Sequence, residues 1–336
     1  MQNPDLNDLD EFSLIKSLFE PLTRGGAGAF GLQDDGAVFN VPAGLEVGMS
    51  KDILTAGVHF HDRDAPDIIA RKALRVNLSD LAAMGAHPYG YLLGLAWPRD
   101  RPRGEIENLA KGLAHDGAHY DISLLGGDTI ATKGPLTLSV TVCGFVPQGT
   151  CLRRAGAAAG DGIYVSGTVG DAAAGLGVLQ GRVSCSSPRH EAYLTERYHL
   201  PEPRQALGVA LRGVATAAVD VSDGLVADLG HLCEASGVGA TIELRHLPLS
   251  GALISAQPTA TDDQQADAYS LVLGGGDDYE LLFTAPAEAG EVVAEVATGT
   301  DTSVTRIGVI EAGSGVRVVD ASGGPLSLPG TGYRHF

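Results

Sequence analysis

The stretch VDVSDGLVADLGHL, residues 219–232, constrains the fold of this chain more than any other. It reads as a buried strand that stops at a Ser-Asp-Gly sequence, followed by a helix with apolar residues at helical spacing. Two aspartates, Asp220 and Asp223, therefore stand at one strand-to-helix junction. Two unit charges about 4 Å apart repel by roughly 1 kcal/mol in water and about 4 kcal/mol near a protein surface. We expect a positive group to compensate this crowding.

Composition limits the class of protein. The chain has 336 residues, which allows two domains, and no run of 18 or more apolar residues, so no transmembrane helix is expected. A net charge of −18 argues against binding to nucleic acid or to an anionic membrane. The acidic N-terminus lacks the basic start of a signal peptide. Four widely spaced cysteines without a C-x-x-C pair predict reduced thiols in a cytoplasmic protein: Cys143, Cys151, Cys185 and Cys233.

Strand and helix patterns alternate along the chain and predict a mixed α/β (α+β) fold. The first half is expected to contain helices at 11–19, 66–84 and 104–119 and strands at 44–52, 122–129 and 135–146, with a glycine turn at Gly126-Gly127. Composition shifts at Pro147–Gly160. Beyond it, strands are expected near 162–166, 217–221, 240–244, 279–285, 306–310 and 316–320. We therefore expect two domains, 1–148 and 149–336.

Two short motifs occur in each half, in the same order. VNLSDLAAMG (76–85) is similar to VDVSDGLVADLG (219–230), and LLGGDT (124–129) is similar to LGGGDDYE (273–280). Each half would then carry one Ser-Asp junction and one Gly-Gly-Asp turn. Such motifs arise easily by chance, so they indicate a duplication only weakly.

The aspartates at the ends of apolar runs are candidates for metal binding. A single aspartate in such a place is as often a turn residue or a helix cap, and Ser79 or Ser222 could cap a helix in the same way. A structural role as turn residue or helix cap is a much weaker explanation for nine such aspartates taken together. Carboxylates without clustered Cys or His suit a hard cation such as Mg²⁺ or Mn²⁺, shared with substrate phosphates. The nine are Asp34, Asp35, Asp52, Asp80, Asp128, Asp220, Asp223, Asp277 and Asp278.

Other features agree with a nucleotide substrate but are individually weak. The Gly-Gly-Asp motifs would bring backbone N–H groups beside carboxylates, where phosphates and their metal ions can be held together. The sequence has no Walker A motif and no kinase H-R-D and D-F-G set. A lone histidine such as His59 is more often structural, and Arg154 is more often a surface charge, although it could reach a triphosphate. The residues alone indicate a Mg²⁺-dependent, nucleotide-using enzyme.

A wider set of motifs resembles the thiamine-monophosphate kinase family from Phe12 to Phe336. The motifs appear in the family's order: QDDGAV, KDILTAGVHF, RKALRVNLSDLAAMGA, LLGGDT, RRAGAAAGDGIYVSGTVGDAAAGL, VDVSDGL and GGGDDYELLF. The wider superfamily includes aminoimidazole ribonucleotide synthetase, selenophosphate synthetase and a hydrogenase maturation protein. Selenophosphate synthetase normally carries a reactive Cys or selenocysteine near its N-terminus, whereas the first cysteine here is Cys143.

The resemblance implies a fold, a reaction and an assembly. The fold would be the two-domain aminoimidazole ribonucleotide synthetase-like fold, with an N-terminal mixed-sheet domain that pairs in a homodimer and a C-terminal α/β domain. The reaction would be phosphorylation of thiamine phosphate to thiamine diphosphate, by direct in-line transfer from ATP with several Mg²⁺ ions. Positioning and Mg²⁺ would supply the catalysis, without a catalytic side chain.

The resemblance also assigns site residues by position. The expected metal ligands are Asp35, Ser50, Asp52, Asp80, Asp128, Asp220 and Asp223. Gly127, Asp128, Arg154 and Ser222 would hold ATP. The substrate-contacting residues would be His59, Asp277 and Tyr333.

Three positions depart from the family pattern. Where the family has Gly-x-Gly-Asp-Asp, this chain has Gly31-Leu32-Gln33-Asp34-Asp35. The family's Ser/Thr-Thr-Asp is replaced by Ser50-Lys51-Asp52, and a family glutamate is replaced by Asp277. Lys51 would either substitute for a cation or contact phosphate. Two alternatives stay open: another ATP-dependent enzyme of the superfamily (aminoimidazole ribonucleotide synthetase-like or hydrogenase maturation-like), and an inactive metal- or nucleotide-binding scaffold. The complete aspartate set argues against the scaffold.

Overall fold

The computed structural model describes residues 10–258, 268–320 and 322–326. Contacts divide the chain into two compact units, residues 1–81 with 87–148, and residues 82–86 with 149–336. The boundary expected after residue 148 falls between the units, but Ala82–Ala86, expected in the first domain, groups with the second unit. Within the described residues, no helix combines the length and apolar character that crossing a bilayer needs.

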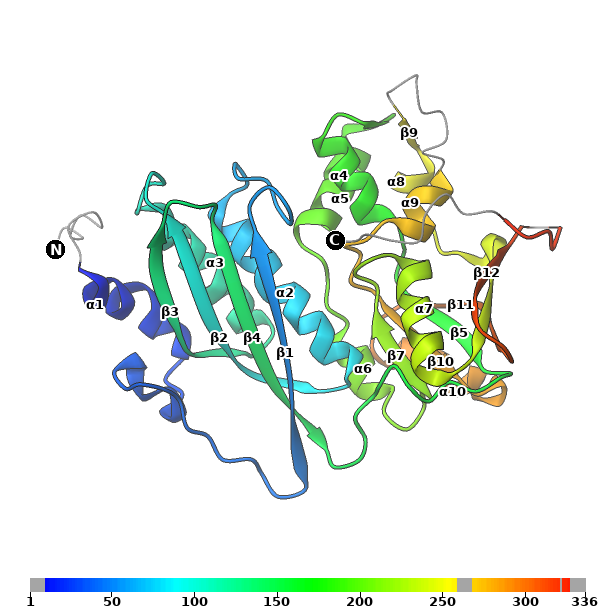
Figure 1. Cartoon of the computed structure of the whole chain (residues 1–336), viewed down its shortest axis with the longest axis horizontal. Helices are drawn as coiled ribbons and strands as arrows, with labels where there is room; N and C mark the ends of the chain where they lie inside the picture. Colours follow the sequence, from blue (N-terminus) through cyan, green and yellow to red (C-terminus); the bar gives the residue numbers. More distant parts are fainter. Residues whose placement is uncertain (1–9, 259–267, 321, 327–336) are drawn as a thin grey trace. The chain divides into compact units, whose positions relative to one another are not determined.

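The first unit is built on a four-stranded mixed sheet with the strand order β1-β4-β2-β3, in which β2 and β3 are parallel and the other pairs antiparallel. Helices α2 and α3 lie against one face of it (Figure 1). The elements are α1 (Glu11–Leu14), η1 (Ile15–Phe19), η2 (Glu20–Thr23), η3 (Ala27–Leu32), β1 (Leu45–Thr55), α2 (Pro66–Ala83), β2 (His87–Pro98), α3 (Glu105–His119), β3 (Ser123–Thr132) and β4 (Thr137–Pro147).

The two faces of this sheet differ in burial, as the alternation of side chains along a strand requires. Leu93 and Leu95 of β2 and Val140 of β4 are buried on the helix-covered face. On the other face, Met49 of β1 is 60% exposed and Leu92 of β2 is 42% exposed. Apolar residues therefore cover both faces, whereas α2 and α3 cover only one.

The second unit contains a six-stranded sheet with the order β12-β8-β11-β5-β10-β7. Its elements are β5 (Gly162–Ser166), α4 (Asp171–Leu179), β6 (Val183–Cys185), α5 (Pro188–His199), α6 (Gln205–Ala210), β7 (Ala217–Asp220), α7 (Leu225–Ser236), β8 (Gly239–Glu243), η4 (Leu244–His246), α8 (Gly251–Ile254), β9 (Ala256–Pro258), α9 (Ala268–Gly274), β10 (Leu281–Ala285), η5 (Ala287–Ala289), α10 (Gly290–Gly299), β11 (Val304–Glu311) and β12 (Gly315–Val319).

Both faces of the central strands in this sheet are buried. In β5, Ile163 and Val165 belong to one apolar cluster with residues of α4, α7 and α9. Tyr164 between them belongs to another cluster, with residues of α6 and α10, and stacks on Phe283 of β10 at 5.3 Å between ring centroids. The sheet thus has a helical layer on each side, which explains why its strands read as continuous apolar runs.

The expected mixed α/β fold is confirmed, and α2 and α3 match the helices expected at 66–84 and 104–119. Two local expectations are wrong. The Gly126-Gly127 pair lies inside β3 rather than in a turn, because the ladder with β2 continues past a bulge to Thr132. The Ser79-Asp80 pair lies inside α2, where Ser79 is fully buried and cannot cap the helix. The two halves therefore do not repeat the same junctions.

Candidate functional site

One group of predicted ligands lies between β1 and α2. The hydroxyl of Ser50 donates a hydrogen bond to Asp80 Oδ2 at 2.6 Å, which joins the strand to the last turn of the helix. Asp52 is two residues farther along β1, so its side chain points to the same face as that of Ser50. The backbone N–H of Asp52 donates to Asn77 Oδ1 at 3.0 Å, which fixes the edge strand against α2. The structure brings Ser50, Asp52 and Asp80 together, and it adds Asn77, which the sequence analysis missed.

The electrostatics of this group favour a cation. Burial and the nearby charge of Asp80 raise the pKa of Asp52 to about 6. A bound cation would reverse this effect, because it stabilises the ionised form of both carboxylates. The donor atoms are hydroxyl and carboxylate oxygens, the set that Mg²⁺ prefers. These residues therefore fit a hard divalent ion.

Lys51 lies outside this group. Side chains alternate along β1, so Lys51 points to the opposite face from Ser50 and Asp52, where Met49 and Ile53 are also exposed. Its Cα pairs with Thr141 of β4. Lys51 therefore does not occupy the place of a ligand beside Ser50, and its ammonium does not stand in for a cation at that position.

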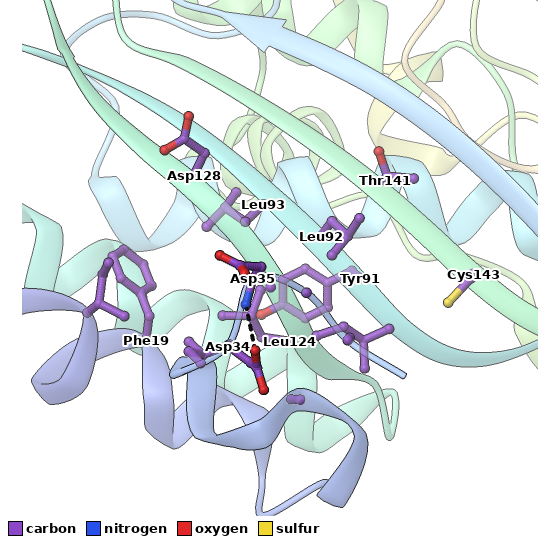
Figure 2. A pocket seen from close by; sticks show the side chains of 18 of the residues that line it. Phe19, Asp34, Asp35, Tyr91, Leu92, Leu93, Leu124, Asp128, Thr141 and Cys143 are labelled. Atoms are coloured by element: carbon purple, nitrogen blue, oxygen red, sulfur yellow. Dashed lines mark hydrogen bonds between the residues drawn. The ribbon is translucent and has the colours of Figure 1, made fainter. Parts of the chain in front are cut away.

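A second group lies at β3, along a cavity of about 520 Å³. Asp35, in the loop after η3, and Asp128 of β3 both line it (Figure 2). The rest of the lining is mainly apolar and includes Phe19 and Tyr91. A side chain at Gly127 would place its Cβ 2.0 Å from the carbonyl oxygen of Leu93, so only glycine fits there. The predicted ATP residues Gly127 and Asp128 thus belong to a cavity of ligand size.

The two groups lie at opposite edges of one sheet. Asp52 of β1 pairs with Val140 of β4, Val140 with Leu93 of β2, and Leu93 with Gly127 of β3. Asp52 and Gly127 are therefore separated by three inter-strand spacings, or about 14 Å. Within one copy of the first unit, the Ser50–Asp52–Asp80 group and the Asp35–Asp128 group are therefore not adjacent.

In the second unit, β7 ends at Asp220 and α7 begins at Leu225. The turn between them is held by Asp228, whose Oδ2 accepts hydrogen bonds from the N–H groups of Ser222, Asp223 and Gly224 at 3.0, 3.0 and 3.1 Å. Gly224 has a φ of 128°, a conformation that side chains rarely allow. The carboxylate of Asp228, which belongs to α7 itself, therefore accepts the hydrogen bonds from these three N–H groups.

Asp223, Asp228 and His231 form a compact polar group in which one ligand atom of each lies within 4.8 Å of the others. Burial, and then the charge of Asp223, raise the pKa of Asp228 to about 6. Asp228 and His231 were missed by the sequence analysis. Their spacing of three residues on α7 was the available signal, because it puts them on one side of the helix near its first turn.

The segment Gly274–Glu280 packs its backbone against this turn. Asp277 N donates to the carbonyl of Ser222 at 2.9 Å, and Tyr279 N donates to the carbonyl of Val221 at 2.8 Å. A Cβ at Gly276 would lie 2.2 Å from the oxygen of Ser222, so the approach requires glycine. A predicted substrate residue, Asp277, thus lies beside a predicted nucleotide residue, Ser222.

Arg154 lies elsewhere in the second unit. Its carbonyl accepts a hydrogen bond from Ser236 Oγ at 3.0 Å, at the last residue of α7. Ser222 precedes the first residue of the same helix, about 18 Å away along its axis. The backbones of these two predicted ATP residues are therefore not adjacent, and both assignments stay predictions. Tyr333 lies outside the described residues.

His59 follows β1 in the first unit and has a defined tautomer. The N–H of Thr55 donates to His59 Nδ1 at 3.1 Å, and Lys72 Nζ donates to the carbonyl of His59 at 3.1 Å. Because a backbone N–H can only donate, Nδ1 must be the acceptor, and the neutral ring carries its proton on Nε2. The hydrogen-bond donor of the half-buried His59 ring is therefore its Nε2–H.

Comparison with known proteins places both units in one family. The profile "AIR synthase related protein, N-terminal domain" matches residues 33–146, and "AIR synthase related protein, C-terminal domain" matches residues 158–321. The thiamine-monophosphate kinase of Caulobacter vibrioides is 43% identical over 91% of this chain and 85% of its own length.

Two solved structures extend the comparison. A crystal structure of thiamine-monophosphate kinase from Stenotrophomonas maltophilia is 41% identical, with a TM-score of 0.81, over 92% of this chain and 96% of that one. A structure described as AaThiL complexed with AMPPCP and TMP is 31% identical, with a TM-score of 0.76, over 100% of both chains. This chain therefore belongs to the thiamine-monophosphate kinase family of AIR synthase related proteins.

Proposed function

We propose that this protein transfers the terminal phosphoryl group of ATP to thiamine monophosphate and forms thiamine diphosphate and ADP. The observation that carries the proposal is the similarity, over nearly the whole chain, to proteins named for this activity. The relative complexed with AMPPCP and TMP supports the same pair of substrates, since AMPPCP is an analogue of ATP and TMP fits thiamine monophosphate.

The transfer is direct and in line. Phosphoryl transfer leaves a protein mainly two tasks, holding donor and acceptor in line and neutralising charge on the transferred group. Bound Mg²⁺ would supply that neutralisation, held by Ser50, Asp52, Asp80, Asp35, Asp128, Asp220 and Asp223. No side chain has to form a covalent intermediate. The substrate-side roles fall to His59 and to Asp277, a carboxylate suited to the positively charged thiazolium.

The cavity beside β3 supports a place for the nucleotide. Its volume of about 520 Å³ lies within the range of ligand sites, and its walls are mainly apolar, as a purine base requires. Asp35 and Asp128 lie along it and would meet the phosphates together with their metal ions. Gly127 has no side chain, so its backbone is exposed at the cavity. We assign the nucleotide to this cavity on that basis.

We further propose that the active form is a homodimer in which the two ligand groups of the first unit meet across the interface. Two observations support this arrangement. The groups lie at opposite edges of one sheet, about 14 Å apart, so one copy does not bring them together. The face of the sheet away from α2 and α3 exposes apolar side chains outside the cavity beside β3 that a second sheet could cover: Ile53 and Ile130. A cytoplasmic location is proposed with it, because ATP and Mg²⁺ are supplied there.

The test is a direct assay. The purified protein is incubated with ATP, Mg²⁺ and thiamine monophosphate, and the products are separated by chromatography. We expect thiamine diphosphate and ADP in equal amounts, with free thiamine a poor acceptor. ATP hydrolysis that requires an aminoimidazole precursor or a carboxylate instead would move the protein to another branch of the superfamily. Nucleotide binding without any turnover would favour the inactive scaffold.

A further inference from the structure

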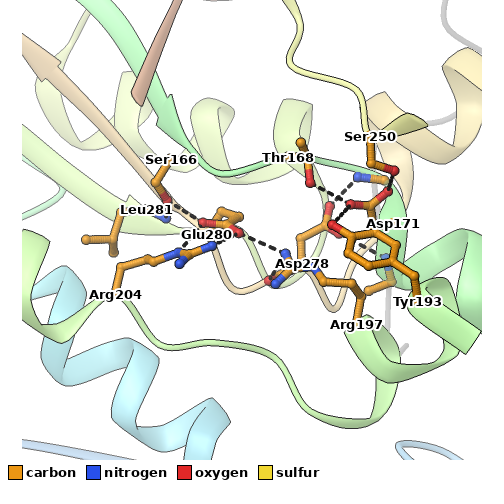
Figure 3. A network of polar contacts seen from close by, with 12 residues as sticks. Ser166, Thr168, Asp171, Tyr193, Arg197, Arg204, Ser250, Asp278, Glu280 and Leu281 are labelled. Carbon is orange, nitrogen blue, oxygen red and sulfur yellow. Dashed lines mark hydrogen bonds and ion pairs between the residues drawn. The ribbon is translucent and has the colours of Figure 1, made fainter. Parts of the chain in front are cut away.

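A buried ionic network surrounds Asp278 and Glu280, in the segment before β10 (Figure 3). Glu280 has no exposed surface and Asp278 is 1% exposed, yet both follow Asp277 within three residues. Arg197 of α5 and Arg204, just before α6, reach Glu280 from separate segments.

Glu280 is the centre of the network. Arg204 donates to both of its carboxylate oxygens, at 2.7 and 2.6 Å, and Ser166 Oγ donates to Oε2 at 2.5 Å. Burial alone would raise the pKa of Glu280, but the two guanidinium groups hold it below its usual value. A Cβ at Gly167 would lie 2.2 Å from Glu280 Oε1, so the chain leaves space for this carboxylate.

Arg197 connects Glu280 with the backbone of the loop. Its Nη2 donates to Glu280 Oε1 at 2.8 Å and to the carbonyl oxygen of Asp278 at 3.4 Å. The Asp278 side chain accepts from the N–H groups of Gly170 and Ala172, at 2.6 and 3.1 Å, at the start of α4. Asp278 is thus fixed through both its backbone and its side chain.

The loop between these anchors has an unusual backbone. Asp277 has a φ of 70° and Tyr279 a φ of 51°, left-handed conformations that are uncommon outside glycine. Asp278 and Glu280 point into the network, whereas the half-buried Tyr279 donates its hydroxyl to Asp277 Oδ1 at 3.3 Å. Two strained residues in one loop are maintained only where the surrounding contacts hold the backbone in that conformation.

We propose that Arg197 and Glu280 are positioning residues: they lock the Asp278–Glu280 backbone so that Asp277 is presented to the thiamine moiety beside the Ser222–Asp223 turn. The inference rests on the proposed function, which makes Asp277 a substrate contact. A buried ion pair is in general a weak source of stability, because desolvation offsets the attraction. Its geometric effect is stronger, since a displacement of about 1 Å at a substrate contact can cost roughly 100-fold in rate.

The experiment compares Arg197→Met with Arg75→Met. Arg75 is also buried and also pairs with a buried carboxylate, Asp116 at 2.6 Å, but in the first unit. Both variants should melt at a lower temperature than wild type. Only Arg197→Met should accelerate hydrogen exchange in the peptide 274–281, and only it should lower kcat/KM for thiamine monophosphate, by roughly tenfold to 100-fold. The KM for ATP should change by less than about twofold in both variants.

A conservative variant completes the series. Arg197→Lys retains the charge, so it should fold even if the methionine variant does not, and it should show a smaller change in the same direction. Unchanged hydrogen exchange at 274–281, or an equal change in both KM values, would overturn the inference. If wild type does not use thiamine monophosphate, the proposed function fails, and the hydrogen-exchange comparison alone decides whether the two residues hold the loop.

Discussion

The N–H of Asp277 donates to the carbonyl of Ser222 at 2.9 Å, so a predicted substrate residue and a predicted nucleotide residue are joined through their backbones. The two residues come from different segments, the loop before β10 and the turn before α7. A phosphoryl transfer requires the acceptor and the nucleotide phosphates to be adjacent. Main-chain contacts hold these two predicted residues side by side in the second unit, and side-chain substitution does not remove such contacts.

Asp220 ends β7 and is 4% exposed. Asp220→Asn keeps the shape and removes one charge, so turnover should fall by roughly 100-fold. The Mg²⁺-free protein should melt at the same temperature or higher, because a like charge near Asp223 has gone. The rise in melting temperature with Mg·ATP should shrink. A lower melting temperature without metal, with an undiminished rise, would instead identify Asp220 as a structural cap.

Asp52 should make the stability of the metal-free protein depend on pH. Its pKa is raised to about 6, so the unfolded chain releases this proton at a lower pH than the folded protein. Between about pH 4 and 6 the folded state binds more protons, and its stability therefore falls as the pH rises. Thermal melts in EDTA should show that Asp52→Asn gains stability relative to wild type across this interval and no further above about pH 7. If the melting temperatures of Asp52→Asn and wild type changed with pH in parallel, that result would contradict the raised pKa of Asp52.

Ser50 and Lys51 are neighbours with opposite orientations on β1, which makes them a matched pair. Ser50→Ala removes the hydroxyl next to Asp80 and should raise the Mg²⁺ concentration for half-maximal rate by roughly tenfold. Lys51→Thr should leave that concentration unchanged, because its side chain points to the other face. A steeper Mg²⁺ dependence in Lys51→Thr would show that the lysine does substitute for a ligand.

The two ligand groups of the first unit can be tested by complementation. Asp52→Asn and Asp128→Asn should each be nearly inactive. If an active site takes Asp52 from one copy and Asp128 from the other, an equal mixture of the two variants should recover about a quarter of the wild-type activity, since half of the dimers are mixed and each has one intact site. Subunits are exchanged by co-expression with two affinity tags. Mixed dimers without activity would refute the shared site.

His59 is a proposed contact of thiamine monophosphate. His59→Ala should raise the KM for thiamine monophosphate by about tenfold, as expected for the loss of one hydrogen bond to a charged group. The KM for ATP should stay within about twofold. His115→Ala, at a side chain that is 59% exposed, serves as the control and should change neither value. An increase in the KM for ATP alone would move His59 to the nucleotide side.

The sequence predicted the elements whose patterns are long or sharply bounded. The helix at 66–84 and the strand at 135–146 were recognisable because their apolar residues recur at one period over many residues. Glycine residues predicted local structure less well than the apolar patterns did. Gly126-Gly127 resembled a turn, but the pair lies within β3, where the absence of a side chain allows the close approach to Leu93.

The residue types that carry the chemistry can be read from the sequence: aspartates at the ends of apolar runs and a set of motifs in the family's order. How these residues are grouped depends on the fold. It placed Asp52 and Asp128 at opposite edges of a sheet, turned Lys51 away from Ser50, and put Asp228 under the turn that carries Asp223. Strand register and helix packing bring together residues that are distant in sequence, and a local pattern contains no information about those pairings.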